Sequence, residues 1–247
     1  MEQNLSKKTR TESDLIGSRE VPESALYGVQ TLRGIENFRI SKFHLNEYPL
    51  FIQALAITKM GAAVANRELD LLTEEQADAI LKACKEILEG KHHDQFPVDM
   101  IQGGAGTTTN MNANEVIANR ALELMGHERG EYQYCSPNDH VNCSQSTNDA
   151  YPTAIHIGMY FKHLQLLPHL EELIASFRKK GEEFSQIIKM GRTQLEDAVP
   201  MTLGQTFNGF ASILQDEIAH LNEAAADFLV VNLSLIHISE PTRPRLI

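Results

Sequence analysis

Hydrophobic residues recur every three or four positions along most of the chain after residue 48, which is the spacing of one face of an α-helix. Polar segments rich in glycine and hydroxyl side chains separate these stretches. The pattern predicts an all-α protein with helices from Pro49, from Thr73 to Gly90, and over 111–126, about 149–180 and about 205–230. Residues 1–48 lack this period, and we expect irregular structure there with short strand or turn pieces such as "ENFRIS".

Single residues mark the ends of some of these helices. Pro49 suits a first helical position, where its missing N–H is not needed. Thr73 and Gln76 have the spacing of a capping box. Pro168 lies inside the fourth helix and is expected to kink or split it. The last two helices cannot bury their apolar faces alone, so we expect further helices from missing chain or from other subunits.

The first polar segment, residues 91–110, ends in "GGAGTTTN". This stretch does not match a phosphate-binding loop, because no Gly-Lys-Ser/Thr follows and its glycines do not fit G-x-G-x-x-G. What remains is a loop whose glycines allow close backbone approach, followed by Thr107, Thr108 and Thr109. Such a loop is either a flexible connector that caps the next helix or part of a binding site.

The second polar segment, residues 127–148, leads into Asp149 through "NCSQSTND" at 142–149. Asn148 or Asp149 is the expected N-cap of the following helix. The same helix start presents free N–H groups and the positive end of the helix dipole, to which Ser146, Thr147 and Asn148 add side-chain donors. The segment can therefore cap a helix, bind a carboxylate without arginine, or do both.

The third polar segment, "MGRTQLEDAVPMTLGQ", places Arg192, Thr193 and Gln194 on a turn between helices. Thr193 and Gln194 can donate hydrogen bonds to a substrate, whereas Arg192 can equally be a solvated or structural charge. Three other residues, Cys135, His140 and Cys143, are one ligand short of a zinc site and have unsuitable spacing. We therefore expect no metal.

Composition limits the remaining possibilities. The hydrophobic share of 42% and charged share of 22% are typical of a globular protein, and the formal net charge of −11 argues against nucleic acid or an anionic membrane surface as the partner. Three cysteines without framework spacing favour a reducing compartment. The start of the chain has no apolar signal region and no apolar run is long enough for a membrane span, so a cytoplasmic location is expected.

Four long strings of the sequence together resemble the aspartase/fumarase superfamily. They are "ESDLIGSREVPESALYGVQTLRGIENF", "GGAGTTTNMNANEVIANRALELMG", "PNDHVNCSQSTNDAYPT" and "GRTQLEDAVPMTLGQ". The resemblance runs from about Glu12 to Leu233. It is greatest to the aspartate ammonia-lyases, because fumarases usually carry "SSND" and "GRTH" where this chain has "STND" and "GRTQ", and because "GEYQY" at 130–134 is similar to aspartases.

The resemblance implies reversible elimination of ammonia from L-aspartate to give fumarate, without an organic cofactor. Matched by motif, Thr107, Ser146 and Thr147 would contact the reacting β-carboxylate, and Asn148, Thr193 and Gln194 would surround the leaving amino group. The family also implies a homotetramer whose active sites combine loops from different subunits. Its serine loop, G-S-S-x-x-M-P-x-K-x-N, which supplies the base, is absent from these 247 residues. No catalytic base is therefore assigned, and the chain as written is expected to be inactive.

The fold that the family implies is an N-terminal, mostly helical domain over 1–145, followed by the start of a long central helix bundle over 146–233. Residues 234–247 contain "SLIHISEPTR", which resembles the translation of a sequencing adapter, so we expect a non-native tail and a truncated gene. Two alternatives stay open. One is a fumarate hydratase of the same fold, and the other is a non-catalytic helical structural protein.

Overall fold

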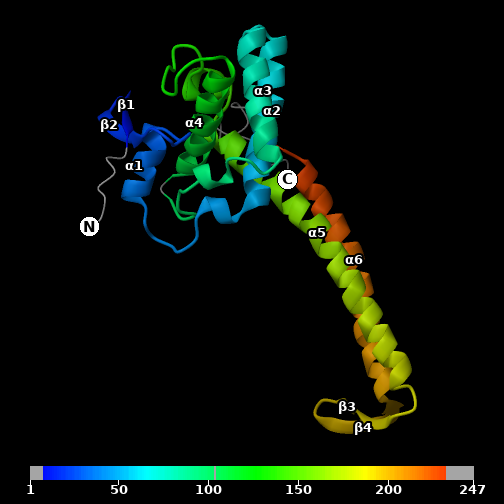
Figure 1. Ribbon diagram of the computed structural model, residues 1–247. Helices are drawn as coiled ribbons and strands as arrows, with labels where there is room; N and C mark the ends of the chain where they lie inside the picture. The colour runs from blue at the N-terminus through cyan, green and yellow to red at the C-terminus, as the bar shows by residue number, and fades with distance from the viewer. Residues whose placement is uncertain (1–7, 103, 232–247) are drawn as a thin grey trace, which may run out of the picture. The chain divides into compact units, whose positions relative to one another are not determined.

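The computed structural model describes residues 8–102 and 104–231 (Figure 1). Two compact units divide the chain, one reaching to Gly158 and the other spanning Met159–Val230. The described residues are mainly helical, with two small antiparallel hairpins, so the predicted all-α fold class is confirmed. The division after Gly158 differs from the predicted domain boundary at 145/146, which stays a prediction, and residues 234–247 lie outside the described residues.

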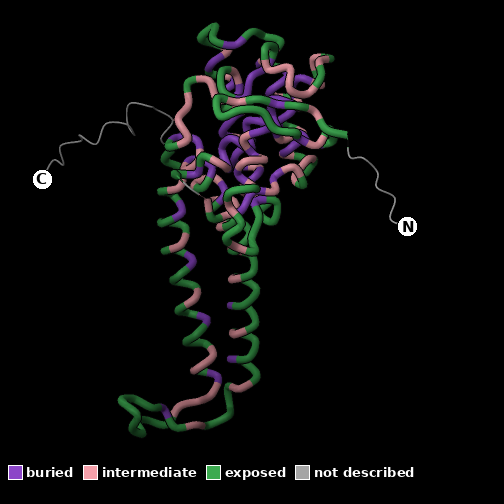
Figure 2. The backbone as a smooth tube through the Cα atoms, turned by 90° about the vertical axis from the view of Figure 1, so that its left-hand side faces the viewer, coloured by how far each residue is buried: buried purple, intermediate pink, exposed green. Residues whose placement is uncertain are grey.

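The first unit is built on helices α2 (Pro49–Glu68), α3 (Glu74–Leu88) and α4 (Thr107–Leu124), into which the start of α5 (Thr147–Glu183) packs. Figure 2 shows buried residues concentrated in this helical region. The largest fully buried apolar side chains come from all three helices and the segments beside them: Leu45, Ile52, Leu55, Ile80, Ile87, Phe96, Val98, Ile117 and Leu122. Short helical turns lie at Leu45–Glu47, His93–Gln95, Pro137–Val141 and Asp227–Leu229.

The predicted start of α2 and the predicted start and end of α3 are confirmed. Pro49 is the first residue of α2. The Thr73 hydroxyl accepts the Gln76 N–H while the Gln76 side chain accepts the Thr73 N–H, which forms the capping box before α3. Gly90 follows the end of α3 with φ of 87°, a conformation that glycine adopts without strain.

The first 48 residues are more regular than predicted. Strands β1 (Thr9–Asp14) and β2 (Gly17–Pro22) form a hairpin, and helix α1 (Val29–Asn37) follows. The start of α1 is capped by two buried carboxylates from elsewhere in the chain. Glu115 accepts the N–H groups of Gly28, Gln30 and Thr31, and Glu12 accepts that of Val29. No local pattern could reveal α1, because its caps come from α4 and β1.

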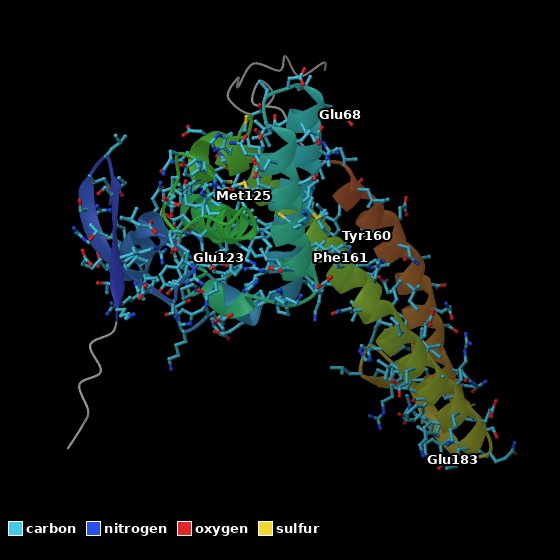
Figure 3. All side chains as sticks on the ribbon, turned by 45° about the horizontal axis from the view of Figure 1, so that its top comes forward. Glu68, Glu123, Met125, Tyr160, Phe161 and Glu183 are labelled. Atoms are coloured by element: carbon cyan, nitrogen blue, oxygen red, sulfur yellow. The ribbon has the colours of Figure 1, made fainter. Side chains whose placement is uncertain are left out.

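The second unit consists of the rest of α5 and of α6 (Leu203–Ala226), joined by the hairpin of β3 (Ile188–Thr193) and β4 (Glu196–Thr202). Glu183 marks the end of α5 next to this connection (Figure 3). Ile174, Ala211 and Ile218 form the small core between the helices. Of the kink or split expected at Pro168, the split is wrong, since α5 continues through it, whereas the kink stays a prediction. The segment predicted as a loop forms the two strands.

Many large apolar side chains of the second unit stay exposed, among them Leu164, Leu166, Leu173, Phe210 and Ile213. The expectation that further helices cover α5 and α6 stays a prediction. Among residues 8–102 and 104–231, no helix combines the length and the hydropathy that crossing a membrane requires.

Candidate active site

Helices α4 and α5 begin next to each other in the first unit. Thr107 is the first residue of α4, and Thr147 is the first residue of α5. The Asn110 side chain, one turn into α4, donates from Nδ2 to Thr147 Oγ1 at 3.0 Å. The structure therefore brings together two of the three polar segments, although the predicted start of the third helix at residue 111 was four residues late.

A glycine permits this close approach. Gly106 precedes α4 with φ of 87°, and a Cβ added there would lie 2.2 Å from the ring of Tyr151 in the first turns of α5. The Tyr151 ring also packs edge-on against Phe51 of α2, with ring centroids 5.6 Å apart. A side chain at position 106 would therefore force the starts of α4 and α5 apart.

A groove of about 690 Å³ lies where these two helix starts meet. Its lining comes from the loop before α4 and the first turns of α5: Met100, Ile101, Gln102, Gly104, Ala105, Gly106, Asn148, Tyr151, Pro152 and Ile155. Asn148 is the predicted site residue that faces this groove. Thr107 is exposed beside it, and Ser146 and Thr147 are half-buried.

The N-cap of α5 is Ser146, which corrects the prediction of Asn148 or Asp149. Ser146 Oγ accepts the Asn148 N–H at 3.2 Å, and Asp149 Oδ2 accepts the Ser146 N–H at 3.1 Å. The Ser146 side chain thus caps the N–H of the second helical residue, and Asp149 at the third helical position reaches back to the Ser146 N–H, as the third residue of a capping box does. This arrangement leaves the side chain of Asn148 exposed and free of any capping role.

Polar side chains of α2 and α4 hold the second polar segment in place through hydrogen bonds. Asn142 Oδ1 accepts hydrogen bonds from Lys59 Nζ at 2.9 Å, Asn110 Nδ2 at 3.0 Å and Asn114 Nδ2 at 3.2 Å. Lys59 also donates to Gln145 Oε1 at 2.9 Å. Two helices, α2 and α4, thereby fix the loop that leads into Thr147.

Lys59 is completely buried in α2. Burial lowers the pKa of its ammonium to about 7, against a smaller opposing effect of the neighbouring Cys84. Its two acceptors are amide oxygens rather than carboxylates, so the lysine binds the loop without forming an ion pair.

Sequence reasoning missed Lys59, Asn110, Asn114 and Asn142. A signal was present in "NMNAN", because Asn110 and Asn114 lie four residues apart and share one face of a helix whose residues from 109 to 119 are all buried. A second signal was the single lysine in the apolar window "ALAITKMGAA". Neither signal names a partner, since the groups that meet are separated by 28 to 83 residues in the sequence.

Thr193 and Gln194 lie in the second unit, at the tip of the β3–β4 hairpin. Gln194 and Leu195 form its two-residue turn with φ of 50° and 66°, where side chains other than glycine, asparagine or aspartate are strained. Both Thr193 and Gln194 are exposed. They belong to a different compact unit from Thr107, Ser146, Thr147 and Asn148, and their assembly into one site stays a prediction.

The chemistry of the first-unit group follows from its side chains. Hydroxyls, an amide and two helix starts supply hydrogen-bond donors to an anion, and none of these side chains carries a charge at neutral pH. Among the described residues, no three His, Cys, Asp or Glu side chains gather as metal ligands. His140, considered with Cys135 and Cys143, accepts the Ser136 N–H through Nδ1 at 2.7 Å.

Comparison with known proteins identifies the family. Residues 17–234 match a family described as "Lyase". The "Aspartate ammonia-lyase" of Pseudomonas canavaninivorans is 58% identical over 91% of this chain and 48% of its own length. The crystal structure of a fumarate lyase:delta crystallin from Brucella melitensis superposes with a TM-score of 0.88 and 52% identity, over 91% of this chain and 49% of that one. A class II fumarase from Schistosoma mansoni gives a TM-score of 0.82 and 36% identity, over 91% and 47% of the two chains.

The chain belongs to this lyase family, which confirms the resemblance to the aspartase/fumarase superfamily. It spans about half the length of the curated relatives that it matches. Its identity to the aspartate ammonia-lyase exceeds its identity to the Schistosoma fumarase, as the "STND" and "GRTQ" motifs predicted.

Proposed function

We propose that the complete protein containing this chain is an aspartate ammonia-lyase, which converts L-aspartate reversibly to fumarate and ammonia. The observation that carries the proposal is the meeting of the α4 and α5 starts, where Asn110 contacts Thr147 and Asn148 lines a neighbouring groove. The names of relatives that are more than 50% identical support the same activity.

The reaction requires stabilisation of negative charge beside a carboxylate. A base takes a proton from the carbon next to the β-carboxylate, the electron pair forms an enediolate, and its collapse breaks the C–N bond and releases ammonia. Thr107, Ser146 and Thr147 would donate to this carboxylate as its charge increases. A single well-placed donor of this kind can contribute roughly 3–4 kcal/mol.

Asn148, Thr193 and Gln194 would contact the amino group that leaves. The serine-loop signature of the family is absent from the 247 residues, so the proposal gives this chain the binding of substrate and assigns removal of the proton to no residue in it. We propose no cofactor and no metal for this reaction.

We also propose that the complete protein is a cytoplasmic homotetramer. The exposed apolar side chains on α5 and α6, such as Leu173 and Ile213, favour burial by further helices. The three cysteines are free, which suits a reducing compartment. In a tetramer, the hairpin bearing Thr193 and Gln194 can come from a different subunit than the α4 and α5 starts.

The test uses the complete gene product, obtained by reading the gene past the codon for Leu233. Fumarate absorbance is followed with L-aspartate and, separately, with L-malate. The proposal expects fumarate from aspartate at a kcat/KM at least about 100-fold above that for malate, which is a difference of about 2.7 kcal/mol. Preference for malate would support the fumarase alternative instead. Absence of turnover with both substrates would support the structural alternative.

A further inference from the structure

A buried asparagine determines which way the Thr147 hydroxyl can donate. We propose that Asn110 is a positioning residue that presents Thr147 Oγ1 to a substrate carboxylate as a hydrogen-bond donor. This inference rests on the proposed function, in which Thr147 binds that carboxylate, and it goes beyond it by naming the group that prepares Thr147.

The amide orientation of Asn142 is fixed on both sides. Its Nδ2 donates at 3.0 Å to the backbone carbonyl of Gln145, which can only accept. Its Oδ1 therefore faces the opposite side, where Lys59 Nζ lies at 2.9 Å. Lysine has enough N–H groups to donate to both Asn142 and Gln145 whether or not it is charged, so this orientation does not depend on the protonation of Lys59.

The orientation of Asn110 follows from that of Asn142. Asn110 must turn Nδ2 toward the Asn142 oxygen, which lies 3.0 Å away. The second hydrogen of the same Nδ2 then points to Thr147 Oγ1, also at 3.0 Å. Because an amide nitrogen does not accept hydrogen bonds, Thr147 Oγ1 must be the acceptor in this contact.

A threonine hydroxyl has one hydrogen and two lone pairs. Asn110 occupies one lone pair of Thr147 Oγ1, and the hydroxyl donates to no other atom in the described part of the chain. Its hydrogen is therefore available to an acceptor from outside. A carboxylate only accepts, so the amide chain favours the hydroxyl orientation that a dicarboxylate needs.

The burial of Asn110 supports a role beyond packing. Its side chain is 1% exposed, and its Oδ1 has no hydrogen-bond partner within the described residues. An unpaired buried amide oxygen is unfavourable, and an aliphatic side chain would avoid this cost. The two bonds made by Nδ2 are what an aliphatic residue could not provide.

A double-mutant cycle tests the proposal in the complete protein. The dissociation constant of succinate, an unreactive dicarboxylate, is measured by titration calorimetry for wild type, Asn110→Leu, Thr147→Val and the double variant. Thr147→Val should weaken binding about 10- to 100-fold, because it removes a hydrogen bond to a charged group. Asn110→Leu should weaken it at least about threefold, and the double variant should be no weaker than Thr147→Val, because coupled residues are not additive.

Asn114 provides a matched control. It lies one turn further along α4, is fully buried, and also donates to Asn142 Oδ1, at 3.2 Å. Its own Oδ1 likewise has no hydrogen-bond partner in the part of the chain that the structure describes. It makes no contact with Thr147 among the hydrogen bonds of the described residues. Asn114→Leu should therefore lower stability as much as Asn110→Leu does, while changing succinate affinity less than about twofold. Thr147→Ser, which keeps the hydroxyl, should retain the effect of Asn110→Leu.

The outcomes separate the inference from the proposed function. Additive losses in the cycle, or equal losses of affinity in Asn110→Leu and Asn114→Leu, would overturn the role of Asn110 even if L-aspartate is a good substrate. A coupled cycle in a protein that does not release fumarate from L-aspartate would support the role of Asn110 and contradict the proposed function. If Asn110→Leu does not fold, Asn110→Ala serves in the same cycle.

Discussion

Asn110 Nδ2 lies 3.0 Å from Thr147 Oγ1, so the first turn of α4 is hydrogen-bonded to the first residue of α5. This contact joins two polar segments through residues that lie 37 positions apart along the chain. The proposed binding of a dicarboxylate to a protein with a net charge of −11 would rely on donors close to the ligand. Local donors at two helix starts act over a few ångströms, whereas the distant acidic surface is screened by salt.

We predict that replacing Gly106 separates the two helix starts. Gly106→Ala introduces a Cβ at φ of 87° and 2.2 Å from the Tyr151 ring, so both backbone strain and a clash lower stability. Gly126 is the matched control, because it has a similar φ of 83° and no atom within 4 Å of an added Cβ. Gly106→Ala should lower the free energy of unfolding, measured with urea, by about 1–3 kcal/mol more than Gly126→Ala does. Equal costs would mean that Tyr151 does not pack against this glycine.

The buried lysine predicts a dependence of stability on pH. The pKa of Lys59 is about 7 in the folded protein and near 10.5 in the unfolded chain. Between these pH values the unfolded state binds more protons than the folded state. The contribution of Lys59 to the free energy of unfolding therefore increases as the pH rises. Wild type should therefore gain stability relative to Lys59→Met between pH 7 and 9, by at most about 1.4 kcal/mol per pH unit.

The exposed Lys82 supplies the control for this experiment, since Lys82→Met should show no such slope relative to wild type. The range stops at pH 9 because burial raises the pKa of Cys84 to about 12. Above pH 9 the unfolded thiol loses its proton first, so the contribution of Cys84 to stability falls with pH and opposes that of Lys59. A flat difference between wild type and Lys59→Met from pH 7 to 9 would show that Lys59 keeps its ordinary pKa.

An ion pair between α3 and α4 predicts how the stability of the protein changes in acid. Arg120 contacts both oxygens of Glu86, at 2.6 and 2.9 Å, and these hydrogen bonds lower the pKa of Glu86 to about 2. Its stabilisation is complete above the unfolded pKa of 4.5 and is lost as the pH falls toward 2. Glu86→Gln should lower the free energy of unfolding by about 1–2 kcal/mol at pH 7. The difference in stability between this variant and wild type should shrink between pH 5 and 3. Exposed Glu128→Gln should change stability little at either pH.

The sequence predicted the helices whose ends are marked locally. Pro49 and the Thr73–Gln76 box lie within the segments they terminate, so periodicity and capping were sufficient. Helix α1 could not be predicted, because the caps of its polar start come from Glu12 and Glu115. The β3–β4 hairpin is mostly exposed, and β4 lacks the alternation of a half-buried strand.

The sequence names the surface groups of the candidate site, whose roles stay predictions, but not the buried side chains that hold them in place. Hydroxyl and amide residues beside glycine are visible as motifs, and the structure brings Thr147 to the first turn of α4. The amide chain through Asn142 was not visible, because the hydrogen bonds that Asn142 Oδ1 accepts come from helices distant in the sequence. Whether a buried asparagine faces another donor or an acceptor depends on tertiary packing, which no local pattern records.

The most direct test of the account is the position of a bound dicarboxylate in a crystal structure of the complete protein with succinate. The account predicts one carboxylate within hydrogen-bond distance of Thr147 Oγ1, at the meeting of the α4 and α5 starts, with Asn110 Nδ2 still on the opposite side of that hydroxyl. Succinate bound elsewhere, with the groove beside Gly106 and Asn148 unoccupied at saturating ligand, would contradict it.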